Sequence, residues 1–400
     1  MHLTHICPRF KESHGGGEPV LLHLFNQLCN LGFENTVCTY NFPLAMRSLL
    51  DSRIVLKELP KIFNRNFVNV LVAGFYDLFC SVFLTINASK VTDVVCFHTE
   101  SVIPALFFYR LFGGTKPALY FCFQPPRFAY DTTQETARAG GLIGLLVPLF
   151  KAVYRPFDKT TVRRADIVTT FSHDYRRWIE GIYHITGVKV LPPGVERPKT
   201  LPRLPEHIIS LLSQSKAKTL LFVGKLVTWK NVDRLINITA LVGMKFPSVR
   251  LLIVGDGPCM ASLRQQATDM GLENKVIFCG YVSGDEVFSY CALADLLVLL
   301  EQNASFGLSL IEANAMGLPV MAFQGGGPSD IIEDARNGFL LPKDSIDEDI
   351  AELICGYFSD DQKAKAMRSE ALGVAAKFTW PHFAEAFGKA VLELKGKRSP

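Results

Sequence analysis

The sequence has little of what marks several classes of protein. Its 42 basic and 38 acidic residues leave a formal net charge of only +4, whereas nucleic-acid binders usually carry a basic stripe and a pI above about 9. We therefore expect no nucleic-acid partner. No long stretch is low in complexity, which argues against a disordered chain. The first residues, MHLTHICPRF, lack a charged segment followed by an apolar run, so we expect no secretory signal peptide.

Paired cysteines are also missing. The ten cysteines are scattered along the chain and none forms a C-x-x-C pair. Most of them stand in apolar runs, where a free cysteine behaves as a small core residue. This distribution predicts a reducing, cytoplasmic location and argues against disulfides or zinc. We expect no metal site.

No apolar run clearly spans a membrane. Segment 67–86 has the length, but Asn69, Gly74 and Asp77 interrupt it, which favours a buried helix. Segment 141–157 is too short to span, and its apolar half is followed by Lys151 and Arg155. That order suits either a helix lying in a bilayer interface or a core or lid helix. Both interpretations stay open from the sequence.

What the sequence does contain is a regular alternation of strands and helices over a length that suits two domains. Short, continuous apolar runs predict strands buried on both faces of parallel sheets: 94–98, 118–123, 166–172, 219–224, 250–255, 275–280, 295–300 and 319–323. Helical patterns lie among them: 18–31, 231–243, 259–271, 284–292 and 308–316. The alternation predicts a doubly wound α/β architecture.

A proline-rich stretch within 192–218 predicts the hinge between the domains, and 378–394 reads as one amphipathic helix. We therefore expect a first domain over 1–196 and a second over 197–377. The terminal segment 378–400 is expected to form a helix that packs back on the first domain.

Several turns between a strand and a helix could bind an anion. "SHGGGEPVLLHLFNQLCNLG" (13–32) puts three glycines before a helix whose N–H groups are free, and "FVGKLVTWKNVDRLI" (222–236) places Lys225 and Lys230 around the loop after a buried strand. Alone, either pattern also fits an ordinary turn or solvated lysines. "LLIVGDGP" (251–258) is no dinucleotide fingerprint, and "DED" (347–349) opens a helix, where acids favour the dipole.

In order and spacing, these motifs resemble glycosyltransferase family 4. The resemblance is densest over 219–342, in "VGKLVTWKNVDRLI", "LLIVGDGP", "SFGLSLIEANAMGLPVMAF" and "GGPSDIIEDARNGFLL". "FQPPRFAYD" (123–131) and "VLPPGVE" (190–196) look like the branch that builds lipopolysaccharide and other surface glycans. The resemblance implies a retaining enzyme with the GT-B fold, two Rossmann-like domains facing a central cleft.

The resemblance also implies the substrates. The donor would be a nucleoside-diphosphate sugar, GDP-mannose or a UDP-sugar, held by the second domain without a metal or other cofactor. The acceptor would be a glycan or a lipid-linked molecule on the first domain. Such an enzyme would be cytoplasmic, with peripheral contact at the inner face of the cell membrane.

Roles carry over to matching positions. Glu312 would hold the ribose hydroxyls, and Lys230 and Lys225 would contact the diphosphate. The backbone of the "SFGL" turn would face the phosphates, and two glycines of the first domain would reach them. These backbone positions are Ser305, Phe306, Gly307, Leu308, Gly15 and Gly16.

Three positions depart from the family pattern. Lys225 replaces an arginine, Phe123 replaces a common histidine, and Ala304 replaces the first glutamate of a pair whose second member is Glu312. Glu301 and His98 are the nearby candidates to supply the missing catalytic chemistry. Alternatively, the donor sugar does not need that glutamate. A degenerate member that binds a nucleotide sugar or supports a partner without turnover is the main competing hypothesis, and a GT-B epimerase is disfavoured by the motif set.

Overall fold

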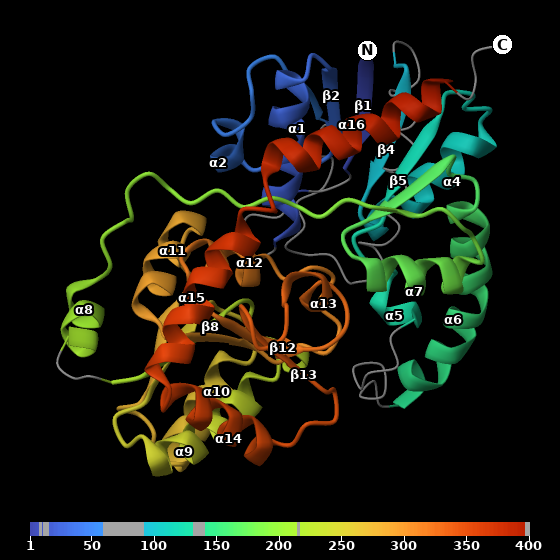
Figure 1. The fold of residues 1–400 in the computed structure, drawn as a ribbon. Coiled ribbons are helices and arrows are strands. Elements are labelled where there is room, and N and C mark those ends of the chain that lie inside the picture. Colours follow the sequence, from blue (N-terminus) through green and yellow to red (C-terminus); the bar gives the residue numbers. More distant parts are fainter. Residues whose placement is uncertain (8–9, 11–15, 59–91, 131–140, 214–216, 397–400) are drawn as a thin grey trace. The chain divides into compact units, whose positions relative to one another are not determined.

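The computed structural model describes residues 1–7, 10, 16–58, 92–130, 141–213 and 217–396, and it divides the chain into two compact units (Figure 1). Unit 1 comprises Met1–Pro192 and Trp380–Pro400, and unit 2 comprises Pro193–Thr379. The sequence placed these divisions at 196/197 and 377/378. The predicted buried helix over 67–86 lies outside the described residues.

Unit 1 is built around a parallel sheet with the strand order β3-β2-β1-β4-β5-β6-β7. Its strands are β1 (His2–Ile6), β2 (Glu34–Thr39), β3 (Val55–Glu58), β4 (Val94–His98), β5 (Ala118–Phe121), β6 (Ile167–Thr170) and β7 (Lys189–Val190). Its helices are α1 (Gly17–Asn30), α2 (Leu44–Arg47), η2 (Glu100–Val102), α4 (Ile103–Leu111), α5 (Arg127–Tyr130), α6 (Gly141–Val162), α7 (His173–Tyr183) and α16 (Trp380–Gly396).

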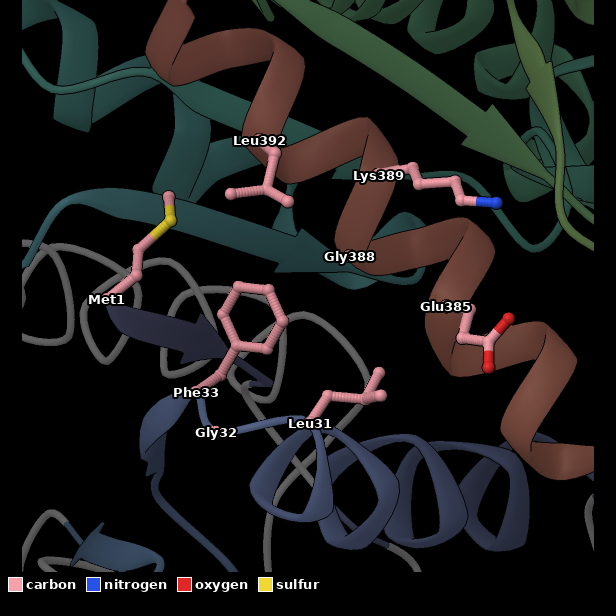
Figure 2. A pocket seen from close by; sticks show the side chains of 8 residues that line it. All are labelled: Met1, Leu31, Gly32, Phe33, Glu385, Gly388, Lys389 and Leu392. Atoms are coloured by element: carbon pink, nitrogen blue, oxygen red, sulfur yellow. The ribbon is translucent and has the colours of Figure 1, made fainter.

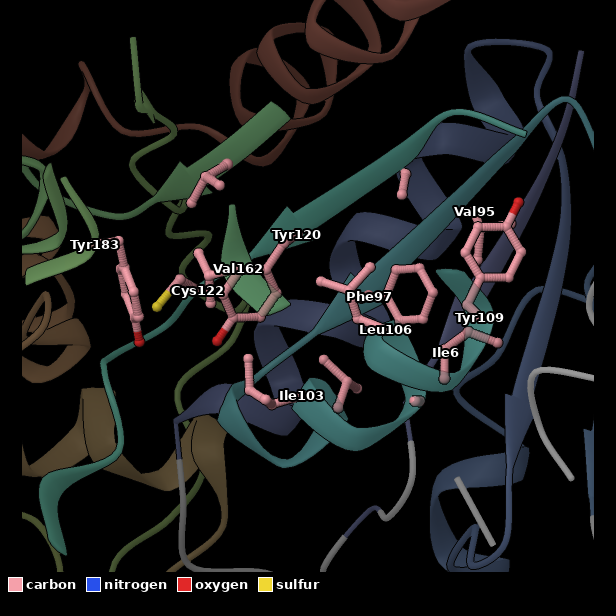
Figure 3. Packing of buried hydrophobic residues seen from close by; sticks show 14 of the residues in the cluster. Ile6, Val95, Phe97, Ile103, Leu106, Tyr109, Tyr120, Cys122, Val162 and Tyr183 are labelled. Carbon is pink, nitrogen blue, oxygen red and sulfur yellow. The ribbon is translucent and has the colours of Figure 1, made fainter. Parts of the chain in front are cut away.

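The central strands of unit 1 are apolar and buried, as their composition predicts. Every residue of β4, VVCFH, is buried, because helices cover both faces of a parallel sheet. On one face Phe97 and Tyr120 pack with Leu106 of α4 and Tyr183 of α7 (Figure 3). Helix α16 packs against α1 although the two are far apart in sequence (Figure 1). The last helix is thus part of the first unit's core.

Unit 2 has a second parallel sheet, with the strand order β10-β9-β8-β11-β12-β13. Its strands are β8 (Thr219–Val223), β9 (Arg250–Val254), β10 (Val276–Gly280), β11 (Leu296–Leu299), β12 (Val320–Phe323) and β13 (Gly338–Leu341). Its helices are α8 (Glu206–Ser213), η4 (Thr228–Lys230), α9 (Val232–Lys245), α10 (Met260–Asp269), α11 (Gly284–Leu293), α12 (Leu308–Ala315), α13 (Pro328–Ile331), α14 (Asp347–Phe358) and α15 (Asp361–Ala375).

These sheets confirm the predicted α/β class. Each has a point where the strand order reverses: between β1 and β4 in unit 1, and between β8 and β11 in unit 2. In open parallel sheets, ligands bind beyond the carboxyl ends of the strands at such a switch point. The loops that follow β8 and β11 are therefore the first place to look for a site in unit 2.

Candidate functional site

At the switch point of unit 2, the loops after β8 and β11 bring two opposite charges together. Lys230 ends the short helix η4, and Glu301 follows β11. The Lys230 Nζ donates to Glu301 Oε2 at 2.5 Å. Glu301 is 4% exposed, whereas the side chain of Lys230 is 21% exposed. The lysine predicted to contact a diphosphate thus forms an ion pair with the glutamate predicted to be catalytic.

Asn231 holds the main chains of the two loops together. Its Nδ2 donates to the carbonyl of Leu300 at 2.6 Å, so one hydrogen bond joins the residues next to Lys230 and Glu301. Asn231 adopts the left-handed conformation, with φ at 52°, as the residue that precedes α9. Asparagine tolerates that conformation better than most residues. Asn231 was not predicted as a site residue, although its position directly before a helix is typical of a capping residue.

Lys225 lies on the same strand-end loop but is exposed. Within the described residues it has no ion-pair partner. Its loop is fixed by the loop after β9: Leu226 N donates to the Asp256 carbonyl at 2.9 Å. A Cβ on Gly255 would come within 1.9 Å of the Gly224 carbonyl oxygen. The glycines of "LLIVGDGP" therefore let two loops approach each other.

The predicted phosphate-facing turn, Ser305 to Leu308, leads into α12. Gly307 precedes the helix with φ at 96°, a conformation that favours glycine. The turn is supported from below by the loop after β12: Gly327 N donates to the Ala304 carbonyl at 3.1 Å. A Cβ on Gly327 would lie 1.9 Å from the Phe306 carbonyl oxygen. Ala304 itself is 3% exposed.

Glu312 lies in α12, the helix that this turn opens. Its side chain is half-buried, and it has no hydrogen bond or ion pair within the part of the chain that the structure describes. Burial raises the pKa of this carboxyl from its ordinary value of 4.5 to about 7. Burial without a hydrogen bond or ion pair is unfavourable for an ionised carboxylate. Carboxylates in such surroundings are typical of ligand-binding and catalytic sites.

In unit 1, the predicted glycine loop is only partly described. Gly15 lies outside the described residues, and Gly16 directly precedes α1. Phe123, which follows β5, packs against the start of this helix: a Cβ on Gly17 would lie 3.1 Å from the Phe123 ring. Phe123 is also in ring contact with Phe121 and Phe171, with centroids 4.9 and 4.5 Å away. An apolar residue at this position joins the core beneath the helix start.

The structure places His98 in the core of unit 1. It is fully buried at the end of β4, with its ring stacked on Phe387 of α16. His5 Nδ1 and His98 Nε2 lie 2.9 Å apart, and His5 Nε2 lies 3.0 Å from Asn35 Oδ1. Burial, followed by the nearby His5, holds the pKa of His98 well below its ordinary value. We therefore leave His98 out of the proposed site and describe it as a buried neutral pair with His5.

Two other sequence predictions have structural counterparts. Asp347 of the "DED" stretch opens α14 and accepts from Arg234 Nε at 2.7 Å, which agrees with a structural role. Segment 141–157 lies in α6, and its side chains are described from Pro148 onward. No helix among the described residues is long and apolar enough to cross a membrane.

Helix α6 nevertheless exposes a group of large apolar side chains. Leu149, Phe150 and Val153 are 63%, 57% and 68% exposed, and Phe128 of α5 joins them, with its ring centroid 5.9 Å from that of Phe150. From Pro148 onward the helix has a single acid, Asp158, which is fully buried beneath the Tyr183 hydroxyl. Its exposed surface is thus apolar and basic.

One hollow of unit 1 lies away from these predicted residues. It is an open groove of about 430 Å³ between α16 and the chain that precedes β1 and β2, lined by Met1, Phe33, Gly388 and Leu392 (Figure 2). This is the amino-terminal edge of the sheet, opposite the glycine loop and the edge where parallel sheets bind ligands. We do not assign this groove to the site.

Known proteins share the fold and much of this sequence pattern. Residues 205–373, most of unit 2, match the family model for glycosyl transferases group 1. The GDP-mannose-dependent alpha-(1-6)-phosphatidylinositol monomannoside mannosyltransferase of Mycobacterium tuberculosis is 26% identical over 246 residues, which cover 59% of this chain and 63% of that protein. The matches span between about two fifths and just over three fifths of the length of the curated relatives.

Two solved structures resemble the whole chain. Sucrose-phosphate synthase from Thermosynechococcus elongatus has a TM-score of 0.80 at 17% identity and covers 99% of both chains. The HepE protein of Anabaena, solved in complex with UDP and glucose, has a TM-score of 0.73 at 19% identity and covers 98% of this chain and 99% of that one. The fold is therefore GT-B, as predicted, and within unit 2 residues 205–373 are similar to glycosyl transferases group 1.

Proposed function

We propose that this chain is a retaining glycosyltransferase that moves a sugar from a nucleoside-diphosphate sugar to a glycan or lipid-linked acceptor. The observation that carries the proposal is the arrangement at the switch point of unit 2. Two lysines, the start of α12 and the half-buried Glu312 follow β8 and β11. Cations and backbone N–H groups suit a diphosphate, and a carboxylate without a partner suits two ribose hydroxyls.

The diphosphate is the leaving group in this proposal. The bond from the anomeric carbon to the phosphate oxygen breaks, the acceptor oxygen bonds to the same face of the sugar, and the acceptor's proton passes to the departing phosphate. Lys225, Lys230 and the N–H groups of the turn before α12 stabilise the negative charge that develops on the diphosphate. These groups supply the role that a metal ion would otherwise have, so we propose that no metal is needed.

The base of the donor is proposed more broadly than its diphosphate. One relative is named as GDP-mannose-dependent, and one structural neighbour is solved with UDP and glucose. Either base is compatible with a carboxylate that binds the ribose. At position 304, where the resemblance implies a sugar-binding glutamate, this chain has a buried alanine. We propose that the donor is either a neutral hexose bound without that acid, or an acidic or deoxygenated sugar that a glutamate would repel or leave unpaired.

The acceptor side is supported by the surface of α6. Leu149, Phe150, Val153 and Phe128 form an exposed apolar group on a helix whose exposed charges are basic. That combination is typical of a helix lying at an anionic bilayer surface. We propose peripheral contact with the inner face of the cell membrane, where a lipid-linked acceptor would be presented. The predicted contribution of Gly15 and Gly16 to the donor site stays a prediction.

A degenerate member that binds a nucleotide sugar without turnover is the second candidate. It is favoured by the three departures at Lys225, Phe123 and Ala304. A thermal-shift screen of nucleotide sugars followed by assay of donor hydrolysis separates the two. A ligand at 100 times its Kd should stabilise the chain by about 2.7 kcal/mol. Binding with turnover supports the transferase, binding without turnover supports the degenerate member, and no binding contradicts both.

The Ala304→Glu variant then tests the sugar pocket. If the donor is acidic or deoxygenated, the wild type should prefer that donor and Ala304→Glu should lose it. If the donor is a neutral hexose, the variant should keep it. Equal activity of both proteins with every donor would mean that position 304 does not contact the sugar.

A further inference from the structure

The ion pair between Lys230 and Glu301 has a consequence for the binding of the donor. Glu301 is 4% exposed, and its Oε2 lies 2.5 Å from Lys230 Nζ. Breaking the ion pair of a buried carboxylate is strongly unfavourable, so Lys230 stabilises Glu301. The same ammonium group is the one proposed to contact the diphosphate. A donor that arrives at this site therefore meets a lysine that already has an anionic partner.

The charges around the switch point sharpen this competition. Lys225, Lys230 and Glu301 together carry one net positive charge, whereas the two lysines alone would carry two. Lys225 is exposed and can approach a diphosphate without losing a partner. Lys230 must first share or leave Glu301. An anion near a buried carboxylate is also repelled directly, because a low-dielectric surrounding weakens screening.

The main chain is arranged so that the exchange needs only a side-chain movement. Asn231 Nδ2 donates to the Leu300 carbonyl at 2.6 Å and fixes the two loops next to the paired residues. Glu301 is held at the end of a buried strand, while the 21% exposed side chain of Lys230 reaches it from the rim of the site. Rotation about the flexible lysine stem can move the ammonium group between two anions.

From these contacts we infer that Glu301 is an exchange partner for Lys230: it holds the lysine when no donor is bound, gives it up to the diphosphate, and takes it back when the product leaves. This inference rests on the proposed function. It makes Glu301 a positioning residue that acts through Lys230, in place of the acid at the sugar that the sequence suggested. Glu301 weakens diphosphate binding and speeds the release of the nucleoside diphosphate.

The decisive variant is Glu301→Gln, which keeps the shape and a hydrogen-bond acceptor for Lys230 but removes the competing charge. We expect its Kd for GDP or UDP, measured by calorimetry, to be at least tenfold lower than that of the wild type. Pyrophosphate, as a probe without base or ribose, should show a similar gain. In steady-state assays the donor KM should fall while kcat does not rise, because the product is held more tightly. The matched control is Glu333→Gln, which removes one partly exposed carboxylate from unit 2 beside Lys377 and should leave every Kd unchanged.

The double variant Lys230→Ala/Glu301→Gln tests whether Glu301 acts through the lysine. Against Lys230→Ala alone, the gain from Glu301→Gln should shrink to about twofold or less. An undiminished gain in affinity would overturn the exchange, because it would mean that Glu301 acts by repelling the diphosphate directly and not through Lys230. An unchanged or weaker Kd in Glu301→Gln, together with a lowered Tm, would show a purely structural ion pair and overturn the inference while leaving the proposed function standing. If neither the wild type nor Glu301→Gln binds any diphosphate, both fail.

Discussion

Replacing Glu312 by glutamine should stabilise the protein and weaken its function at the same time. Burial raises the pKa of this carboxyl from 4.5 to about 7. The folded protein therefore binds the proton more tightly than the unfolded chain does. Below pH 4.5 the carboxyl is protonated in both states and costs nothing. As the pH rises through 7, the folded state loses stability, and above 7 the full cost is present.

The size of the effect follows from that shift in pKa. A difference of this size corresponds to about 3 kcal/mol, and partial exposure of the half-buried side chain reduces it to roughly 2 kcal/mol. Glu312→Gln should thus raise the free energy of unfolding at pH 8 by about 2 kcal/mol and leave it nearly unchanged at pH 4.5. For a unit of this size the Tm at pH 8 should rise by about 4–8 °C.

The same substitution should weaken nucleotide binding. A carboxylate that accepts two ribose hydroxyls contributes charge-assisted hydrogen bonds, and losing them costs roughly 1.5–3 kcal/mol, or about ten- to hundredfold in Kd. Urea denaturation at the two pH values and calorimetry with GDP and UDP measure both effects. Glu333→Gln serves as the control. The hydrogen bond from Lys377 lowers the pKa of Glu333, so removing this carboxylate should not stabilise the protein at pH 8. A Glu312→Gln variant that is equally stable at pH 8 and binds nucleotide as the wild type does would refute the assignment.

Lys230→Ala should lower the free energy of unfolding by about 3 kcal/mol, because it breaks the ion pair with the buried carboxylate of Glu301. Lys225→Ala should stay within about 0.5 kcal/mol of the wild type, and chemical denaturation measures both variants. Wild-type affinity for a nucleoside diphosphate should rise between pH 6 and 8 more steeply than that of Glu312→Gln, since ribose binds the ionised carboxyl; parallel calorimetric profiles would contradict this. The wild type should sediment with anionic vesicles, and serine substitutions at Leu149, Phe150 and Val153 of α6 should release it from them. A wild type that never sediments with the vesicles would contradict membrane contact.

The sequence predicted the alternating strands and helices well, because local apolar runs encode them. Strands β8, β9 and β11 appear at the predicted places, as continuous runs of buried residues. Strand β2 was not predicted, because "ENTVCT" is half polar, although all but its first residue are buried. Its Asn35 is buried because His5 binds its side chain. Such a partner lies across the sheet and leaves no local signal.

The site shows the same limit. Lys230 and Glu301 could each be selected from its motif, but their ion pair joins residues that are 71 positions apart. Only the pairing of β8 with β11 brings them together. The sequence made His98 a candidate to supply the missing catalytic chemistry because it lies near the positions that depart from the family pattern. What it contacts depends on α16, which returns from the far end of the chain to cover it.

Whether the switch point of unit 2 binds and uses a nucleoside-diphosphate sugar is tested by measuring the release of nucleoside diphosphate from a donor panel that includes GDP-mannose and UDP-glucose. The purified chain should release GDP or UDP from at least one donor in the presence of EDTA, and Glu312→Ala should lose that release while remaining folded. Undiminished release by Glu312→Ala, or no release and no nucleotide binding with any donor, would contradict the account.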